Sequence, residues 1–247
     1  MFIFATCVML NESVKHIVKR VFPVTINQRY DKQTKRIMKI VLEDNSTFID
    51  VGSHKGEILS EALKISPNGK HFAFEPIPSL YKKLHSKFGD ICEVKNFGLS
   101  DKRAKSEFYH VTTNSAYSGI KRRTYPKKEN VETIQIELDT LDNQLNKHDR
   151  VDLIKIDVEG GEFDVLKGAI NVIDKFHPVI VFEHGLGASD HYETSPTDIF
   201  EFFSSMDYQL FTLKGFIDDS NSLSMIEFHD LYHSNKEYYF LAKLRVS

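Results

Sequence analysis

The stretch Thr47-Phe48-Ile49-Asp50-Val51-Gly52-Ser53-His54-Lys55-Gly56-Glu57 decides the fold of this chain. It begins as an apolar run that only Asp50 interrupts, and it then turns on Gly52 and Gly56. The apolar residues that follow, from Ile58 to Leu63, have the spacing of an amphipathic helix. A strand, a tight glycine turn and a helix in this order predict the opening of a nucleotide-binding α/β unit. Glycine lets a ligand approach the backbone closely, and the first N–H groups of the helix are free to donate to it.

The residues of this turn also indicate which ligand it does not suit. A dinucleotide fingerprint reads G-x-G-x-x-G, but His54 and Glu57 stand where its second and third glycines would be. The charge of Asp50 would repel a pyrophosphate, whereas it suits a cationic amine or a sulfonium. A ligand with a cationic centre is therefore favoured over a dinucleotide.

An acidic residue ends the next predicted strand. After the turn Pro67-Asn68-Gly69, the segment His71-Phe72-Ala73-Phe74 leads directly to Glu75. A carboxylate at this point of a βαβ unit is placed to accept hydrogen bonds from both hydroxyls of a ribose. Glu75 is therefore predicted to bind a nucleoside.

Two later strands bring polar side chains to the same edge of the predicted sheet. The apolar runs 151–156 and 179–182 are followed by a group of polar residues, which are Asp157, Glu159, Glu162, Glu183 and His184. Carboxylates crowded at a strand end are costly unless something cationic lies among them. In an open α/β sheet, ligands bind at the carboxyl ends of the strands. These residues are therefore candidates for a binding or catalytic site.

Five segments carry a resemblance to a known family. They are FIDVGSHKGE (48–57), FAFEPIPSLYKKL (72–84), KNFGLSD (95–101), LDTLDNQL (138–145) and LIKIDVEGGEFDVLKGA (153–169). With them the chain resembles the FkbM family of methyltransferases, a branch of the class I S-adenosylmethionine-dependent enzymes. The matching region covers about half of the chain, and its last segment is the most specific. The first loop departs from the family, which more often has a small residue and Asn at the positions of Ser53 and His54.

The resemblance implies a fold, a cofactor and the contacts of that cofactor. The fold is α/β, Rossmann-like and doubly wound, with a mostly parallel seven-stranded sheet whose last strand is antiparallel. The cofactor is S-adenosylmethionine. The implied contacts are Asp50, Gly52, Ser53, His54 and Gly56 at the methionine end, Glu75 at the ribose, Leu99 or Phe97 at the adenine, and Asp157 between cofactor and acceptor.

The predicted activity is methylation of a hydroxyl on a sugar or another small metabolite, so a carbohydrate or glycan is the expected partner. Methyl transfer from a sulfonium is an in-line displacement, which requires an aligned acceptor and removal of the hydroxyl proton. Asp157, Glu159, Glu183 and His184 are the catalytic candidates, and the general base is left open among the last three. These side chains could instead hold Mg²⁺ or Mn²⁺, but a metal-free site is expected.

Two alternatives come from other functional classes. The first is a nicotinamide-dependent oxidoreductase on a similar fold, which the missing glycines and Asp50 disfavour. The second is a non-catalytic nucleotide-binding module. Retention of Asp50, Glu75 and the pair Asp157 and Glu159 disfavours it, because without a ligand these charges would only destabilise the strand ends.

Length and composition limit the remaining possibilities. The 247 residues, 41% of them hydrophobic, suffice for one globular unit, which we divide into a helical cover (1–45) and a methyltransferase domain (46–247). A net charge of −3 gives no general reason for nucleic-acid binding. The apolar segment Met1–Leu10 is too short to span a bilayer, which takes ~20 residues, so no stable membrane insertion is expected. Two distant cysteines and the lack of a signal-peptide pattern predict a cytoplasmic protein. The oligomeric state is left open.

The rest of the chain is read as helices and two long polar loops. Helices are predicted at 11–21, 37–42, 57–63, 78–88, 163–173 and 195–206. The first two either cover the site as a lid or pack on the sheet edge. The loop 102–130 is the most basic part of the chain, and it either favours an anionic acceptor or is a solvated run of charges. The loop 215–235 has no predicted role.

Overall fold

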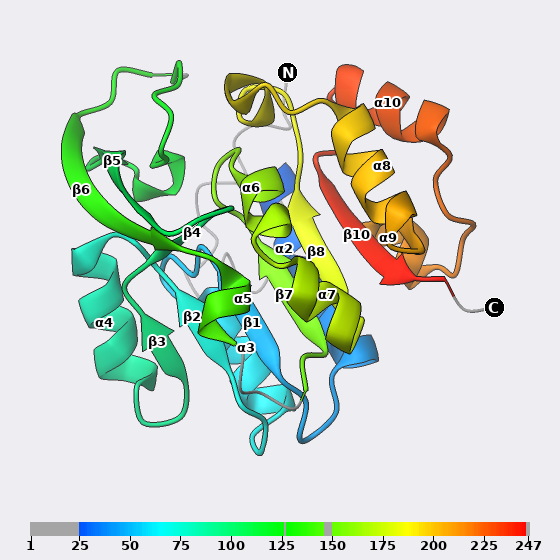
Figure 1. Ribbon diagram of the computed structural model, residues 1–247, viewed down its shortest axis with the longest axis horizontal. Helices are drawn as coiled ribbons and strands as arrows, with labels where there is room; N and C mark the ends of the chain where they lie inside the picture. The colour runs from blue at the N-terminus through cyan, green and yellow to red at the C-terminus, as the bar shows by residue number, and fades with distance from the viewer. Residues whose placement is uncertain (1–24, 126, 146–149, 246–247) are drawn as a thin grey trace, which may run out of the picture.

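The structure of the protein is a computed structural model that describes residues 25–125, 127–145 and 150–245. Within these residues the main sheet has seven strands (Figure 1). In spatial order they are β3 (Glu93–Lys95), β2 (Phe72–Phe74), β1 (Phe48–Val51), β7 (Leu153–Ile156), β8 (Val179–Glu183), β10 (Tyr239–Leu244) and β9 (Tyr208–Thr212). The helix expected at 11–21 lies outside the described residues.

The direction of the strands confirms the predicted fold class. The five strands from β3 to β8 are parallel to one another, whereas β10 is antiparallel to both of its neighbours, β8 and β9. The strand order reverses between β1 and β7, which follow one another in space but not in the chain. Ligands of open α/β sheets bind at the carboxyl ends of the strands at such a point.

Helices cover both faces of the sheet (Figure 1). One face carries α2 (Ile26–Val41), α3 (Glu57–Ile65), α4 (Pro78–Phe88) and α9 (Leu213–Ile217), and its core includes Phe48, Leu59 and Leu213. The other face carries α5 (Leu141–Gln144), α6 (Glu162–Lys167), α7 (Ile170–Phe176), α8 (Pro196–Ser205) and α10 (Met225–His233). Alternation along each strand assigns its odd and even residues to opposite faces. Polar residues on the α2 face can therefore gather at one edge of the sheet.

Three helical regions differ from the prediction, and the first of them, expected over 37–42, is the end of the longer helix α2. The single helix expected over 163–173 is divided into α6 and α7 at Gly168, where a Cβ atom would lie 2.0 Å from the carbonyl oxygen of Ser100. The region 215–235 is not an irregular loop, because it completes α9 and contains α10. Ser224 caps α10 in a capping box with Glu227, and Phe228 is buried from the same helix.

A second, three-stranded sheet lies beside the first (Figure 1) and was not predicted. Its order is β4 (Gly98–Leu99), β6 (Val131–Asp139) and β5 (Ala104–Val111), and its core contains Phe108 and Ile136. The connection between β5 and β6 includes the short 3-10 helix η1 (Ser115–Tyr117). Much of the basic segment 102–130 is therefore ordered as a strand or held near the edge of the main sheet.

None of the described helices is long and apolar enough to cross a bilayer.

Candidate functional site

A cavity of about 300 Å³ opens at the carboxyl ends of β1, β2, β7 and β8. Residues from α2, from the turn after β1 and from β10 complete its wall. Most of its ionisable lining is acidic: Asp31, Asp50, Glu57, Glu75, Asp157, Glu159 and Glu183. Helix α2 contributes Tyr30, Asp31 and Thr34 to the cavity and buries Ile37 and Met38 against the sheet. It therefore both packs on the sheet and forms one side of the site.

The turn after β1 requires glycine at its first position. Gly52 has φ +76°, and a Cβ atom there would lie 1.9 Å from the carbonyl oxygen of Asp157. Gly56, with φ +72°, precedes α3 directly. The turn therefore packs against the end of β7 while it leaves backbone exposed to the cavity. Ser53 supports the turn from within, since its hydroxyl donates to the carbonyl oxygen of Asp50.

Glu75 is held at the edge of the cavity by two backbone hydrogen bonds. One of its carboxylate oxygens accepts a hydrogen bond from the His54 N–H (2.8 Å), and the other accepts one from the Ile77 N–H (2.9 Å). Burial raises the pKa of Glu75 to about 7, although these two N–H donors oppose the shift. The side chain of His54 points away from this contact, and its Nε2 lies 2.8 Å from Ser115 Oγ. His54 thus links the turn to η1.

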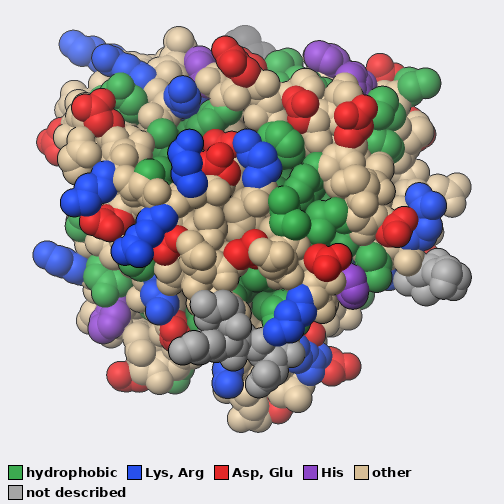
Figure 2. Space-filling model, viewed as in Figure 1, with side chains coloured by type: hydrophobic (Ala, Val, Ile, Leu, Met, Phe, Trp, Pro, Cys, Tyr) green, Lys and Arg blue, Asp and Glu red, His purple; other side chains and the backbone are tan. Residues whose placement is uncertain are grey.

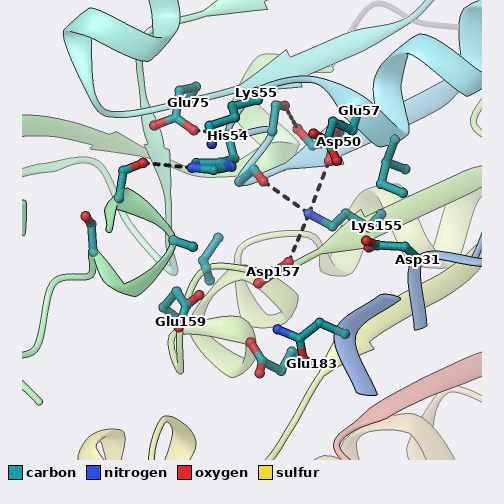
Figure 3. Close-up of a pocket in the computed structure, with 18 of the residues that line it drawn as sticks. Asp31, Asp50, His54, Lys55, Glu57, Glu75, Lys155, Asp157, Glu159 and Glu183 are labelled. Carbon is teal, nitrogen blue, oxygen red and sulfur yellow. Dashed lines mark hydrogen bonds and ion pairs between the residues drawn. The ribbon is translucent and has the colours of Figure 1, made fainter. Parts of the chain in front are cut away.

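Lys155 is the central cation of the site, and it was not among the residues predicted from the sequence. It is only 7% exposed and is the register partner of Asp50 in the parallel pair β1–β7. Figure 3 shows it between Asp50 and Asp157, with its Nζ atom 3.5 Å and 3.3 Å from their carboxylates. Burial alone would lower the pKa of Lys155, but the two carboxylates outweigh it and raise the pKa. The lysine therefore stays protonated.

Asp50 carries the clearest sign that a ligand belongs in the cavity. It is 1% exposed, and within the described residues neither of its carboxylate oxygens accepts a hydrogen bond. Burial raises its pKa, although Lys155 opposes the shift. A buried polar group without a hydrogen bond is rare and costs free energy, even where an ion pair such as that with Lys155 lies beside it. A cationic or hydrogen-bond-donating ligand would satisfy it.

Three carboxylates gather on the other side of Lys155 (Figure 3). Oxygen atoms of Asp157, Glu159 and Glu183 all lie within 4.8 Å of one another. The Tyr239 hydroxyl donates to Asp157 at 2.5 Å, and this contact and Lys155 lower the pKa of Asp157 despite its burial. Burial and the neighbouring carboxylates raise the pKa of Glu183 well above its usual value. The cluster therefore joins an ionised carboxylate to one that readily takes up a proton.

Arg123 joins the basic segment to this cluster. Its guanidinium forms an ion pair with Glu159 and donates to the Gly187 carbonyl oxygen at 3.3 Å. Burial and Asp157 raise the pKa of Glu159 to about 8, although Arg123 opposes the shift. Glu162 lies behind the turn and accepts hydrogen bonds from the Val158 and Gly160 N–H groups. It shapes the turn and is absent from the cavity lining.

The structure places His184 away from the cavity, which corrects its selection as a catalytic candidate. His184 is 1% exposed, and its ring stacks on Tyr232 and Phe228, with centroids 4.7 and 5.8 Å apart. Adjacent strand residues point to opposite faces of a sheet. Glu183 therefore reaches the cavity from the α2 face, whereas His184 enters the core beneath α10. Burial lowers the pKa of His184 to about 4.

A second, smaller cavity adjoins the first beyond Gly52. It is mainly apolar, and Phe97, Leu99 and Phe108 are among the residues that line it. Gly52, Pro76, Phe108 and Val158 line both cavities. A polar, acidic compartment next to an apolar slot matches a ligand that has a charged end and an aromatic base.

Comparison with known proteins agrees with this geometry. Residues 50–210, more than half of the chain, match the model of the methyltransferase FkbM domain. The chain belongs to the FkbM methyltransferase family. The matched domain is therefore that of an S-adenosylmethionine-dependent methyltransferase, with S-adenosylmethionine as its cofactor.

Individual relatives of this FkbM methyltransferase are distant. The AMB antimetabolite synthetase AmbE of Pseudomonas aeruginosa is 26% identical over 166 residues, which are 52% of this chain and 8% of that protein. The crystal structure of an FkbM methyltransferase from Methylobacillus flagellatus KT has a TM-score of 0.50 and 16% identity, and covers 81% of this chain and 44% of that one. An O-methyltransferase from Bacillus cereus, solved with SAH, has a TM-score of 0.47 and 10% identity, and the match covers 97% of this chain and 94% of that one. The chain spans less than half of the length of the first two relatives.

Proposed function

We propose that this FkbM methyltransferase methylates a hydroxyl group of a sugar or another small metabolite, with Glu183 as the general base. The observation that supports this proposal is the division of one cavity into two halves. The half around Asp50 and Glu75 suits the cofactor, and the half around Asp157, Glu159 and Glu183 suits an acceptor.

The residues of the first half fit S-adenosylmethionine. Asp50 is buried without a hydrogen-bond partner in the described chain, and the Gly52 backbone is exposed where a side chain would clash. We assign Asp50, Gly52, Ser53, His54 and Gly56 to the methionine end. Glu75 would accept hydrogen bonds from the ribose hydroxyls, and the slot at Leu99 would take the adenine. When bound, the cofactor supplies a methyl group activated by a sulfonium.

Glu183 is the best placed of the three candidate bases. His184 lies outside the cavity, and Glu159 is already paired with Arg123. Glu183 lines the cavity, and its raised pKa favours uptake of a proton from the acceptor hydroxyl. Asp157, fixed by Lys155 and Tyr239, would orient the acceptor between the two halves. No metal ion is needed for this division of roles.

The acceptor is proposed to be a small molecule, not a nucleic acid. The acidic lining of the cavity would repel a phosphate backbone. On the face of the molecule in Figure 2, basic and acidic side chains are interspersed, whereas nucleic-acid binding favours a continuous basic surface.

The test is transfer of a labelled methyl group from S-adenosylmethionine to a panel of hydroxylated metabolites. Wild-type protein should produce a methyl ether, and Glu183→Gln should lower kcat by about 10²–10⁴-fold, the usual contribution of a general base. Glu201→Gln, an exposed change on α8, is the matched control. Full turnover by Glu183→Gln, or a label found on nitrogen or carbon, would reject the proposal.

A further inference from the structure

The charge of the cavity is strongly unbalanced. Seven carboxylates line it, but only two lysines do, and one of these, Lys155, is already shared between Asp50 and Asp157. S-adenosylmethionine carries a sulfonium, an ammonium and a carboxylate, so it adds only one net positive charge. After the cofactor binds, the carboxyl groups of the cavity therefore still outnumber its cations, and a second cation would stabilise their ionised form.

The excess is concentrated in the acceptor half and at its rim. Asp157, Glu159 and Glu183 lie within 4.8 Å of one another, which is unfavourable unless a cation or a proton lies among them. Asp31 and Glu57 are exposed where α2 and α3 meet the cavity, so they extend the negative potential to its mouth. Such a potential draws in cations and repels anions. The basic segment does not reverse this sign, because Arg123 is occupied by Glu159.

An aromatic wall stands next to the same carboxylates. Tyr30, Tyr238 and Tyr239 line the cavity, and the ring of Tyr30 stacks on Tyr239 with centroids 4.9 Å apart. Tyr239 is the register partner of Glu183 across the pair β8–β10. Aromatic faces attract ammonium groups, and this attraction grows when the cation is removed from water. Carboxylates and aromatic rings on one wall are a known means of binding an organic cation.

Asp50 gives independent evidence that this cavity takes cationic ligands. It is more than nine-tenths buried and lines the cavity, yet neither of its oxygens accepts a hydrogen bond within the described chain. In the cofactor half, Lys155 is thus paired with a carboxylate that has no hydrogen-bond donor, which suits a ligand with cationic groups. The acceptor half repeats this chemistry with more carboxylates and with tyrosines.

We propose that the acceptor is an amine-bearing hydroxy compound, such as an amino sugar or an amino alcohol, whose ammonium group binds between the carboxylate cluster and the wall of Tyr238 and Tyr239. This inference rests on the proposed function, since it names the substrate class of the same site. Of the two alternatives for the basic segment, it disfavours the one in which that segment favours an anionic acceptor.

An ammonium group suits the cluster better than a divalent metal ion does. Lys155 already lies 3.3 Å from Asp157, and Arg123 forms an ion pair with Glu159, so a divalent ion in the cluster would be repelled by two cations. A divalent ion needs six or more oxygen ligands and does not gain from tyrosine faces. An ammonium group has three hydrogen-bond donors, and it is attracted both by the carboxylates and by the tyrosine faces.

The test compares matched acceptors on the complex of the whole chain with S-adenosylhomocysteine. D-glucosamine and ethanolamine are titrated calorimetrically beside their N-acetyl derivatives, and D-glucose and D-glucuronate complete the series. We expect at least one amine to bind about tenfold or more tightly than its acetylated form, and glucuronate to bind weakest. The preference should shrink at high salt. If S-adenosylhomocysteine itself does not bind, the proposed function fails before the acceptor is tested.

Two variants test which carboxylates recognise the ammonium group of the acceptor. Glu159→Gln removes one charge of the cluster and should reduce the preference for an amine over its acetylated form about tenfold. Asp31→Asn combined with Glu57→Gln changes only exposed rim residues, so it should leave the fold intact and reduce the preference by up to about fivefold. Equal or weaker binding of both amines, including no binding at all, overturns the inference. So does an acceptor affinity that requires Mg²⁺ and disappears with a chelator.

Discussion

Replacement of Lys155 by methionine tests the electrostatics on which the site depends. Methionine has a similar volume, so the change removes the charge and leaves little empty space. Lys155 is 7% exposed and lies within 3.5 Å of Asp50 and Asp157, whose side chains are 1% and 25% exposed. Removal of one partner from a buried ion pair costs about 3–5 kcal/mol, because the remaining charge is uncompensated. At about 2–4 °C per kcal/mol for a chain of this size, Tm should fall by roughly 10 °C.

The assay is urea denaturation of the wild type and of Lys155→Met at pH 7.5 and pH 5. Without the lysine, the pKa values of Asp50 and Asp157 should rise, so protonation at pH 5 should remove part of the penalty. The control is Lys64→Met, which breaks an ion pair with Glu61 whose lysine is 68% exposed. That change should cost no more than about 1 kcal/mol. A cost for Lys155→Met equal to that of the control, or one that does not shrink in acid, would refute the reasoning.

Two further predictions concern the turn after β1 and the pH dependence of the site. Gly52→Ala should lower the free energy of unfolding by about 3–5 kcal/mol, because a positive φ is combined with a clash against the Asp157 carbonyl. Gly187→Ala, with φ +89° and open space around it, should lower it by only about 1–2 kcal/mol. Denaturation of both variants checks this, and equal costs would contradict it. Between pH 6.5 and 8.5 the free energy of unfolding of the cofactor-free protein should fall by about 1–3 kcal/mol while affinity for S-adenosylhomocysteine rises, as measured by denaturation and calorimetry across the range.

The sign of the pH effect follows from the buried carboxyl groups. Burial raises the pKa of Glu75 and of Glu162 to about 7 and that of Glu159 to about 8, from an ordinary value of 4.5. The folded state therefore binds more protons than the unfolded state in this window, so stability is lost as pH rises. Glu75 must be ionised to accept hydrogen bonds from both ribose hydroxyls, so the affinity for S-adenosylhomocysteine rises as pH rises. Below pH 6.5 the buried histidines, whose pKa values are lowered, contribute with the opposite sign.

The sequence predicted the parts of the fold that depend on local pattern. The turn at Gly52, the acidic end of β2 and the carboxylates after β7 were all placed correctly at one edge of the sheet, because each follows a short apolar run. Lys155 escaped notice because it lies within such a run. Its partner Asp50 is 105 residues away, and only the register of β1 and β7 brings them together. The role of Arg123 depends likewise on a distant contact, because the connection between β5 and β6 brings it to Glu159 after β7.

Two other differences, at His184 and at α10, have a local signal in the sequence. His184 directly follows Glu183, so strand alternation alone assigns the two side chains to opposite faces. The capping box of Ser224 and Glu227 indicates the start of α10, within a segment that polarity alone suggested was a loop. The division of α6 from α7 had no local signal, because it depends on the close approach of Gly168 to Ser100.

Calorimetric titration with S-adenosylhomocysteine tests the central claim, that the turn after β1 and Glu75 bind the cofactor. We predict micromolar binding by the wild type and by Glu201→Gln, and no binding of NAD. Glu75→Gln should bind about 10–100-fold more weakly, because hydrogen bonds to a charged acceptor contribute about 1.5–3 kcal/mol each. Lack of binding by the wild type, binding of NAD in its place, or unchanged affinity in Glu75→Gln would contradict the account.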